Sequence, residues 1–357
     1  MRNIYHITEN ISLESGGVRT ILKLLHEYLE SQHFNSAIIT NKKEINDDYT
    51  EFKSNSIWNY NKELGSFLKK IEVVDVFHLH GVYTYTQYIA SKVSLEKKLP
   101  YVVSPHGMLE PWILEKGALK KKLYLGLILN NLLKKASVLH AITPLEKNNL
   151  YKLTNHKKIV EIPNLFDFNL VSSNSISYAP KEDYLIYIGR IDKKKGIELI
   201  INSLSKISNK NIKLKILGTE NEYSNYLKSI ITRLNLEDKI EFLGAIYNHE
   251  KYNLITNARA LIAPSYSEAI GMVNLEAAAC KTPVITTFQT GIKKEWSDNG
   301  GKLINPNEKE LKQAIIECLS WGHSERVDRG NSLCNYAYEN YSWNKKGSLW
   351  NELYSSI

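Results

Sequence analysis

Two glutamates, Glu268 and Glu276, are the residues of this chain whose spacing best suggests ligand chemistry. The apolar run Ala260–Ala263 before them predicts a strand, and the residues from Gly271 onward have helical spacing. Glu268 is therefore expected in a strand-to-helix loop, with Glu276 a turn or so into the helix. In an open α/β sheet, ligands bind at this loop edge.

The backbone of the same segment offers a place for phosphate. The N–H groups of Gly271, Met272 and Val273 would be free at the helix N-terminus and able to hold an anion. Two carboxylates beside such a cradle suit a sugar nucleotide, which presents hydroxyls and phosphates together. Two glutamates without function on a surface helix would give the same spacing, so the pattern gains weight only from the rest of the chain.

A basic segment, Gly189-Arg-Ile-Asp-Lys-Lys-Lys-Gly196, follows the strand expected over Tyr184–Ile188. Arg190 is placed at the strand end and Lys195 just before a helix, so both are expected to point into a cleft. Two cations there would neutralise a diphosphate leaving group, whereas a solvated basic loop is the plainer interpretation. No Asp-x-Asp occurs, although that spacing is usual where a divalent cation holds the diphosphate. We therefore expect no metal and no other cofactor.

Glycines also follow the first expected strand. Gly16 and Gly17 precede a clean apolar helical face over Val18–Leu29. Glycines let a backbone approach a ligand closely, and a helix start attracts anions, although a tight turn alone would look the same. The chain has no G-x-G-x-x-G after a strand, so the nicotinamide fingerprint is missing.

Histidines stand at two further strand ends. His106 lies in Ser104-Pro-His-Gly-Met-Leu109, where its imidazole could donate to a sugar hydroxyl or be satisfied within its own domain. His78 and His80 are two apart in a strand and share a face. A metal site is conceivable there, but no third ligand is near in the sequence, so we favour structural or acceptor-side roles.

The chain as a whole alternates short β-branched runs with amphipathic stretches, which predicts an α/β protein with parallel sheets and helices on both faces. Its 357 residues suffice for two domains. We expect an N-terminal Rossmann-like domain over 1–165, a Ser/Asn-rich linker over 166–182 and a C-terminal Rossmann-like domain over 183–340, the two domains facing each other across a cleft. A terminal helix, 341–357, is expected to pack back on the first domain.

The predicted strands are short and rich in β-branched residues. They are Asn3–His6, Ala37–Thr40, Val73–His80, Tyr101–Ser104, Val138–Ala141, Ile159–Ile162, Tyr184–Ile188, Ile212–Leu217, Ile240–Leu243, Ala260–Ala263 and Val284–Thr286.

The composition of the chain limits which classes of partner and which cellular location are expected. The net charge of +8, from 46 Lys+Arg against 38 Asp+Glu, allows nucleic acid, anionic lipid or a phosphorylated substrate. Without zinc-finger spacing or an Arg-rich recognition helix, nucleic acid is not an expected partner. Three widely spaced cysteines suggest neither a disulfide framework nor a zinc site, and no apolar run reaches the roughly 18 residues of a membrane span. A cytoplasmic location is therefore expected.

The stretch 112–135 has two interpretations, because residues 118–135 are apolar with basic ends and Trp112 lies just upstream. A helix of this kind could rest on an anionic membrane surface, which would place the protein at the inner face of the cytoplasmic membrane. The other interpretation is a buried core helix with lysines at its ends, which we slightly favour.

Taken together, these segments resemble the retaining GT-B glycosyltransferases, in particular family 4. The resemblance covers nearly the whole chain and depends on the order and separation of several weak motifs. They are the Gly-Gly loop, Ser-Pro-His-Gly-Met-Leu, Glu161-Ile-Pro-Asn164, Gly-Arg-x4-Lys-Gly, the two spaced glutamates and Thr282-Pro-Val-Ile-Thr286. The Ser-Pro-His-Gly-Met-Leu segment looks like that of enzymes that build bacterial surface polysaccharides such as O-antigen or capsule.

For the second half of the chain, the resemblance implies contacts to a nucleotide-diphosphate sugar. Arg190 and Lys195 match the pair that grips the donor diphosphate. Glu268 matches the glutamate on the donor-sugar hydroxyls, and Glu276 matches the one on the ribose. The backbone of residues 271–273 matches the segment that approaches sugar and phosphate.

For the first half, the resemblance implies that Gly16 and Gly17 lie near the β-phosphate. It also implies that His106 lies near the 6-position of the donor sugar. Two departures stand out in the second half, because Ala269-Ile270 replaces a common Gly-Phe and Gly218-Thr219 replaces a common Gly-Asp/Glu-Gly turn. The first of these puts the identity of the donor sugar in doubt.

The implied reaction is hexose transfer with retained anomeric configuration, from a UDP-sugar rather than a GDP-sugar, to a glycan acceptor. A glycan linked to lipid diphosphate fits as that acceptor. The leaving diphosphate oxygen would deprotonate the acceptor hydroxyl, and the protein would supply positioning and charge stabilisation. Two alternatives stay open. One is a UDP-sugar 2-epimerase of the same architecture, and the other is a non-catalytic sugar-nucleotide-binding protein.

Overall fold

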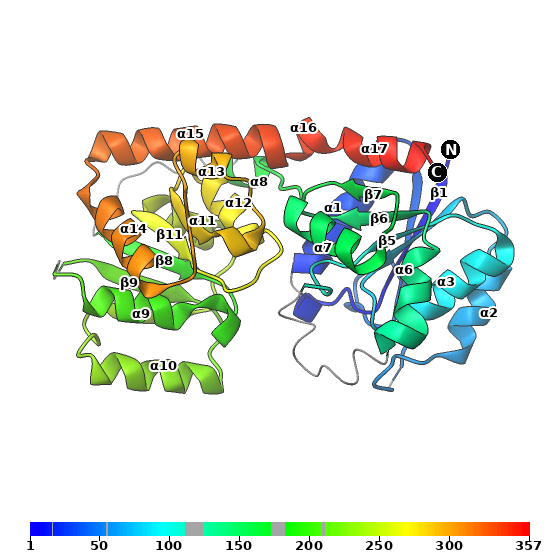
Figure 1. Cartoon of the computed structure of the whole chain (residues 1–357), viewed down its shortest axis with the longest axis horizontal. Coiled ribbons are helices and arrows are strands. Elements are labelled where there is room, and N and C mark those ends of the chain that lie inside the picture. The colour runs from blue at the N-terminus through cyan, green and yellow to red at the C-terminus, as the bar shows by residue number, and fades with distance from the viewer. Residues whose placement is uncertain (16, 55, 111–123, 173–182, 209–210) are drawn as a thin grey trace. The chain divides into compact units, whose positions relative to one another are not determined.

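The computed structural model describes the chain except residues 16, 55, 111–123, 173–182 and 209–210. It divides into two compact units (Figure 1). The first, here called the N-unit, comprises Met1–Asn164 and Gly347–Ile357. The second, the C-unit, comprises Leu165–Lys346.

The N-unit is built on one parallel sheet of seven strands in the order β3-β2-β1-β4-β5-β6-β7. The strand order reverses between β1 and β4, which is the position where α/β sheets open a crevice at their carboxyl edge. The strands are β1 (Asn3–Thr8), β2 (Asn35–Thr40), β3 (Thr50–Glu51), β4 (Val76–His80), β5 (Tyr101–Ser104), β6 (Val138–Ala141) and β7 (Ile159–Glu161).

Amphipathic helices cover this sheet. In α1 (Gly17–Ser31), the buried residues Ile21, Leu22, Leu25 and Leu29 form the face that the sequence predicted. The other described helices of the unit are α2 (Lys62–Lys70), α3 (Tyr85–Lys97), α6 (Asn130–Lys134), α7 (Pro144–Thr154) and α17 (Ser348–Ser355), with a short π-helix at Leu125–Leu129.

The C-unit repeats the scheme with six parallel strands in the order β10-β9-β8-β11-β12-β13. They are β8 (Tyr184–Ile188), β9 (Lys213–Leu217), β10 (Ile240–Gly244), β11 (Ala260–Ala263), β12 (Val284–Thr287) and β13 (Lys302–Ile304). Its described helices are α8 (Asn169–Ser172), α9 (Ile197–Ser205), α10 (Glu222–Arg233), α11 (Asn248–Asn257), α12 (Met272–Ala279), α13 (Glu295–Asp298), α14 (Glu308–Ser320), α15 (His323–Tyr341) and α16 (Trp343–Lys346).

Alternation along β8 shows how the C-unit buries its sheet. Leu185 and Tyr187 belong to one hydrophobic core, and Tyr184 and Ile186 belong to the other, because successive side chains of a strand point to opposite faces. Figure 1 shows α9 and α10 on one side of the strands and α11 and α12 on the other. Both faces are therefore covered, as expected for a parallel α/β sheet.

Strand pairing decides which loops of the C-unit meet. β11 pairs with β8 in parallel, with Ala260 opposite Leu185. The carboxyl ends of both strands therefore lie side by side at one edge of the sheet. The loops that follow them carry the basic segment and the first glutamate.

The segments around the expected linker and terminal helix differ from the prediction. Phe166 is buried and bridges to Ser342, and α8 follows it, so residues 165–172 belong to the C-unit. The rest of the expected linker, 173–182, lies outside the described residues. In place of one helix over 341–357, the chain forms α16 in the C-unit and α17 in the N-unit.

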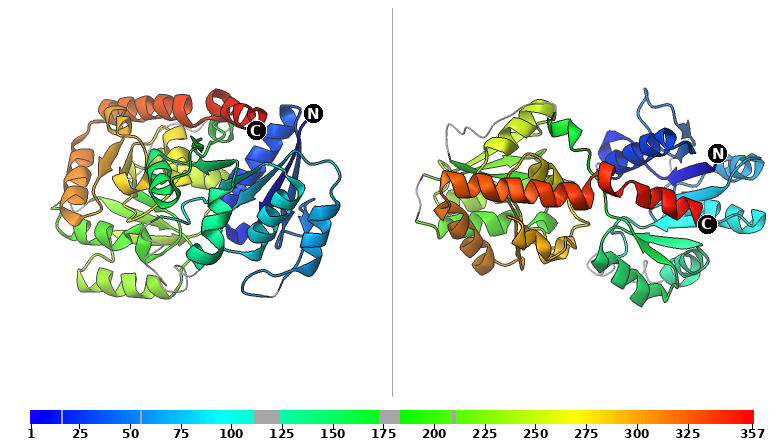
Figure 2. Two further views of the ribbon diagram at one scale, coloured as in Figure 1. Left: turned by 45° about the vertical axis from the view of Figure 1, so that its right-hand side comes forward. Right: turned by 90° about the horizontal axis from the view of Figure 1, so that it is seen from above.

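Helix α17 is held firmly to the N-unit. Trp350, Leu353 and Tyr354 are buried, and the Arg2 guanidinium donates to the carbonyls of Tyr354 and Ile357. Figure 2 shows the two chain ends close together on this unit.

Part of the stretch 112–135 is described, from residue 124 onward. Leu129, Leu132 and Leu133 are buried in the N-unit core, which favours the core-helix interpretation for this part. Residues 112–123 lie outside the described residues. Within the described part of the chain, none of the helices combines the length and apolar character needed to span a bilayer.

Candidate functional site

The loop after β11 has a strained turn directly before α12. Ile270 and Gly271 both have positive φ, at 69° and 61°. A Cβ atom at Gly271 would lie 3.1 Å from both Glu268 Cγ and Asn274 Nδ2, so this position requires glycine. The loop is anchored on the segment after β12, because Ile270 N–H donates to the Thr290 carbonyl at 3.0 Å.

The loop after β8 presses against this one. Lys193–Lys195 form a 3₁₀ turn that Asp192 caps by accepting from Lys194 N–H at 2.8 Å. Gly196 then turns with φ of 70°, and a Cβ there would lie 2.3 Å from the Pro264 carbonyl oxygen. Tyr266 N–H donates to the Lys194 carbonyl at 2.9 Å, which joins the two loops.

This packing brings Lys195 and Glu268 together as an ion pair. Their side chains are only 17% and 20% exposed. The structure thus joins two residues that the sequence assigned to separate motifs, 73 positions apart. An anion that approached Lys195 would compete with Glu268 for the ammonium group.

Glu276 makes a second ion pair of the same kind. Its carboxylate lies 3.0 Å from the ammonium of Lys251 on α11, and both side chains are partly buried. Lys251 could not be predicted from the sequence, because nothing in the pattern of α11 distinguishes it from other surface lysines. Each glutamate of the spaced pair is therefore matched by a lysine from a neighbouring element.

A small hollow that is open to solvent lies beside Lys195 and Glu268. Gly271, Val273 and Asn274 contribute the start of α12 to its wall, and Tyr187, Ile188, Ala263, Ser265 and Thr290 complete it. The amides of residues 271–273 open the helix, where N–H groups have no intrahelical acceptor. The hollow therefore combines a carboxylate, an ammonium and a helix N-terminus.

Asn274 adds a residue that the sequence analysis missed. Its side chain is 1% exposed, and Nδ2 donates to the Ile270 carbonyl at 2.8 Å. Its Oδ1 is buried and has no hydrogen-bond partner among the described residues. Because an unpaired buried acceptor is costly, this oxygen is suited to a hydroxyl donated by a ligand.

Arg190 differs from Lys195 in its surroundings. It is exposed at the end of β8, and its carbonyl accepts from the Tyr187 hydroxyl at 2.7 Å. Its guanidinium has no ion pair or side-chain hydrogen bond within the described ranges of the chain. The structure therefore leaves this cation outside the Lys195–Glu268 pair.

In the N-unit, Gly16 lies outside the described residues. Gly17 is exposed and is the first residue of α1. His106 follows β5 with φ of 53°, and Gly107 follows with φ of 75°. Both positions are left-handed, so this turn needs support from its surroundings.

Glu146 supplies that support. Its two oxygens accept from Gly107 N–H at 2.7 Å and from Ile142 N–H at 2.8 Å. Burial raises the pKa of this carboxyl to about 7, against the lowering effect of the two hydrogen bonds. Glu146 could not be predicted from the sequence, since it lies 39 residues from the turn that it holds.

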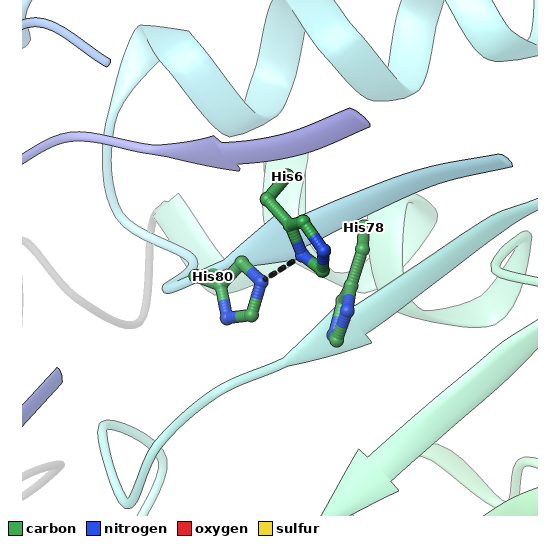
Figure 3. A group of neighbouring side chains, drawn as sticks. All are labelled: His6, His78 and His80. Carbon is green, nitrogen blue, oxygen red and sulfur yellow. Dashed lines mark hydrogen bonds between the residues drawn. The ribbon is translucent and has the colours of Figure 1, made fainter. Parts of the chain in front are cut away.

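Behind His106 lies a group of histidines. His106 Nε2 is 2.9 Å from His80 Nδ1. Figure 3 shows the next contact, in which His80 Nε2 is 3.0 Å from His6 Nδ1. Burial lowers the pKa of His6 and of His106 to about 3, so both rings are neutral at pH 7. The sequence showed no third histidine near His78 and His80. His6 is that third histidine in the structure, because β1 pairs with β4 and places His6 opposite His78.

Comparison with known sequences gives two matches that follow one another along the chain. The sequence model described as Glycosyltransferase Family 4 matches residues 15–170. The model described as Glycosyl transferases group 1 matches residues 172–332.

Curated relatives carry related names. An uncharacterized glycosyltransferase of Methanocaldococcus jannaschii is 30% identical over 188 residues, which is 50% of this chain and 47% of that protein. The O-antigen chain mannosyltransferase RfbU of Salmonella typhimurium is 26% identical over 222 residues, which is 62% of this chain and 61% of that protein. The chain thus spans about half the length of the first of these relatives and less than two thirds of the second.

Solved structures agree on the fold along the whole chain. HepE of Anabaena, in complex with UDP and glucose, superposes with a TM-score of 0.79 at 18% identity, covering 100% of both chains. The lipopolysaccharide outer core galactosyltransferase WaaB superposes with a TM-score of 0.77 at 16% identity, covering 99% of this chain and 100% of the other. With its two parallel-sheet units and both family matches, the chain belongs to the family 4 glycosyltransferases of GT-B fold.

Proposed function

We propose that this protein transfers a hexose from a nucleoside-diphosphate donor to a glycan hydroxyl, with retention of anomeric configuration and without a metal ion. The observation that carries the proposal is the Lys195–Glu268 pair beside the hollow at the start of α12. This arrangement offers a cation for phosphate and a carboxylate for sugar hydroxyls within one partly buried site.

Donor binding would exchange partners at the Lys195–Glu268 pair. The diphosphate takes Lys195, which releases Glu268 to accept from the sugar hydroxyls. The ribose hydroxyls approach Glu276, which Lys251 holds in place. The N–H groups at the start of α12 point toward negative charge, and Asn274 Oδ1 accepts from a donor hydroxyl.

The chemical step breaks the bond between the anomeric carbon and the β-phosphate oxygen. That oxygen takes the proton of the acceptor hydroxyl, and the acceptor oxygen bonds to the anomeric carbon on the same face. Arg190 and Lys195 stabilise the negative charge that develops on the diphosphate. We propose these cations in place of a metal because the sequence lacks Asp-x-Asp.

Two considerations support UDP and a surface glycan. HepE of Anabaena is described in complex with UDP-glucose, and RfbU is an O-antigen chain mannosyltransferase. The net charge of +8 suits an acceptor that is linked to lipid diphosphate at the inner face of the cytoplasmic membrane. We therefore propose a cytoplasmic enzyme of surface-polysaccharide assembly.

The test begins with a thermal-shift panel of UDP, GDP, UDP-glucose, UDP-galactose and GDP-mannose. A donor at about 100 times its dissociation constant stabilises the protein by about 2.7 kcal/mol, which a shift in Tm reveals. The best donor is then incubated with lipid-diphosphate-linked glycans, with and without EDTA, and the product anomer is determined by NMR.

Each outcome decides between the alternatives. A product with retained configuration, formed equally in EDTA, supports the proposal. An isomerised sugar nucleotide would point instead to an epimerase, and tight donor binding without transfer or hydrolysis would point to a binding protein. Inverted product, or activity that requires Mg²⁺, would contradict the proposed mechanism.

A further inference from the structure

A group of buried histidines lies at the carboxyl edge of the N-unit sheet. They come from four adjacent strands: His6 on β1, His78 and His80 on β4, His106 after β5 and His140 on β6. All except the partly exposed His106 are less than 4% exposed. Their hydrogen bonds divide them into two hydrogen-bonded chains. In the first, Ser104 links His78 and His140, and in the second, His80 links His6 and His106.

The direction of the first chain follows from its last acceptor. The Ile162 carbonyl only accepts, so His140 Nε2 donates to it, at 2.8 Å. Burial lowers the pKa of His140 to about 4, so the ring is neutral and its Nδ1 accepts from the Ser104 hydroxyl at 2.7 Å. Ser104 has no second proton, and His78 Nε2 therefore donates to it, at 2.6 Å.

The last link of that chain fixes the other nitrogen of His78. Burial lowers the pKa of His78, so the ring is neutral and Nδ1 carries its lone pair. That lone pair accepts from the Tyr354 hydroxyl at 2.6 Å. His78 thus has no free lone pair. The ligand nitrogens of His6, His78 and His80 lie within 4.8 Å of one another, but this proximity does not make a three-histidine metal site.

The second chain has no such fixed end. His106, His80 and His6 are joined by two hydrogen bonds, and the outer nitrogens, His106 Nδ1 and His6 Nε2, are buried without a partner among the described residues. Three neutral imidazoles hold three N–H groups and three lone pairs. Two hydrogen bonds use two of each, so one end of the chain presents an N–H and the other presents a lone pair.

Only two arrangements satisfy both hydrogen bonds. Either all three rings are protonated at Nε2, and His106 Nδ1 is an acceptor, or all three are protonated at Nδ1, and His106 Nδ1 is a donor. A change between them adds a proton at His106 Nδ1 and removes one at His6 Nε2, while each hydrogen-bonded proton crosses to its partner. Because both end nitrogens are buried, these two protons exchange with water during local opening of the structure. The net charge does not change.

We propose that His80 and His6 are positioning residues that act through His106, by coupling its tautomer to theirs so that the three rings change together. The proposal rests on the proposed function only for the contact between His106 and the donor sugar. A ligand atom that accepts at Nδ1 selects the all-Nδ1–H state, and a ligand hydroxyl that donates selects the other. A buried ring two hydrogen bonds away thereby sets what His106 offers to the ligand.

The first test needs no ligand and no activity. The full chain is labelled with ¹⁵N-histidine, and long-range ¹⁵N–¹H correlation spectra are assigned by single substitution among its ten histidines. The expected result is one common tautomer for His6, His80 and His106, with Nε2–H for His78 and His140. Different tautomers among His6, His80 and His106, or a cationic ring among these three at pH 7, would overturn the proposal.

The second test interrupts each of the two hydrogen-bonded chains by a separate substitution. His6→Leu removes the far partner of His80, so the spectrum of His106 is expected to show both tautomers. Ser104→Ala is the matched control, because it breaks the other chain in the same core and leaves the tautomer of His106 unchanged. An unaltered His106 spectrum in His6→Leu, with the fold verified by its Tm, would contradict the coupling.

Activity and zinc give independent readouts. His6→Leu is expected to lower kcat about 10-fold with little change in donor KM, and His6→Asn, whose amide can donate or accept, is expected to restore it. If the wild-type protein transfers no sugar, the proposed function fails while the spectra still decide on the coupling. If added Zn²⁺ shifted the ¹⁵N signals of His6, His78 and His80 together, that result would show a metal site and overturn the proposed coupling of tautomers.

Discussion

Lys195 and Lys251 each hold one of the two glutamates whose spacing distinguishes the second half of this chain. Both pairs are partly buried, which makes them stronger than surface ion pairs without the full cost of desolvating charge. At the scale of single residues, Lys251 thus fixes the direction of Glu276 before a donor arrives, whereas Glu268 is held by the same cation that the diphosphate would take.

Removal of one charged donor contact should lower turnover strongly. Glu276→Ala and Arg190→Ala are each expected to reduce turnover by roughly 10²-fold or more, the scale of one lost preorganised contact. Steady-state transfer rates with the best donor measure this. Glu308→Ala removes the exposed pair with Lys206 in the same unit and should leave turnover nearly unchanged. Near-normal rates in both site variants would count against the assigned roles.

Glu146 should be important for stability and not only for the shape of the His106 turn. Glu146→Gln replaces one accepting oxygen with an amide that cannot accept, so Gly107 or Ile142 N–H loses its partner. The expected loss in unfolding free energy is about 1–3 kcal/mol, measured by urea denaturation. Glu63→Gln on the exposed side of α2 serves as the control. Equal stability of the two variants would contradict the prediction.

At the scale of elements, the site depends on two loops that meet because β8 and β11 are neighbours. Gly196 allows the first loop to touch Pro264, and Gly271 allows the second to turn into α12. The parallel pairing determines that the loops lie at one edge, and the glycines determine how closely they approach.

A methyl group at Gly271 should disturb both stability and binding. Gly271→Ala forces an alanine to φ of 61° and crowds Glu268, so we expect a loss of about 1–3 kcal/mol and weaker donor binding. Urea denaturation and donor titration measure the two effects. Gly322→Ala is the matched control, since Gly322 has φ of −69° and nothing within 4 Å of an added Cβ. Comparable behaviour of both variants would show that the turn tolerates a side chain.

At the scale of the whole molecule, buried histidines make the N-unit sensitive to acid. The pKa values of His6 and His106 fall to about 3 and that of His140 to about 4, and burial also lowers those of His78 and His80. Below about pH 6.5 the unfolded chain binds protons at these imidazoles that the folded chain does not bind. The unfolding free energy therefore decreases as the pH falls.

Glu146 acts in the opposite direction. Its pKa is raised from 4.5 to about 7, so its contribution is present at acidic pH and is lost as the pH rises through 7. One carboxyl opposes five imidazoles, and the net expectation is a decline in unfolding free energy from pH 6.5 toward pH 4.

Urea denaturation as a function of pH measures this decline. His6→Leu should reduce its slope by up to about 1.4 kcal/mol per pH unit, because the unfolded chain then has one imidazole fewer to take up a proton that the folded chain does not bind. His33→Asn, which removes an exposed imidazole, should leave the slope unchanged. A stability that is flat between pH 6.5 and pH 4 would disprove the account.

Regular elements with a clear period were predictable from the sequence. Tyr101–Ser104, Val138–Ala141, Tyr184–Ile188 and Ala260–Ala263 form strands with the predicted bounds, because their side chains are all apolar, aromatic or small and lie in covered sheets. β3 and β13 were not predicted, since two or three residues are too few to show a period. The Val73–His80 strand begins only at Val76, and Val73 is 64% exposed.

The order of local patterns along the chain was enough to determine the class of the protein and to place Lys195, Glu268, Gly271 and Glu276 on loops and helix starts at strand ends. Those features are local, because periodicity and glycine positions depend on the backbone conformation of a few neighbouring residues. The partners Lys251, Asn274, Glu146 and His6 were decided only by the tertiary structure. Strand order, register and helix packing bring each of them to its own partner within its unit, and residues far apart in sequence carry no local sign of such contacts.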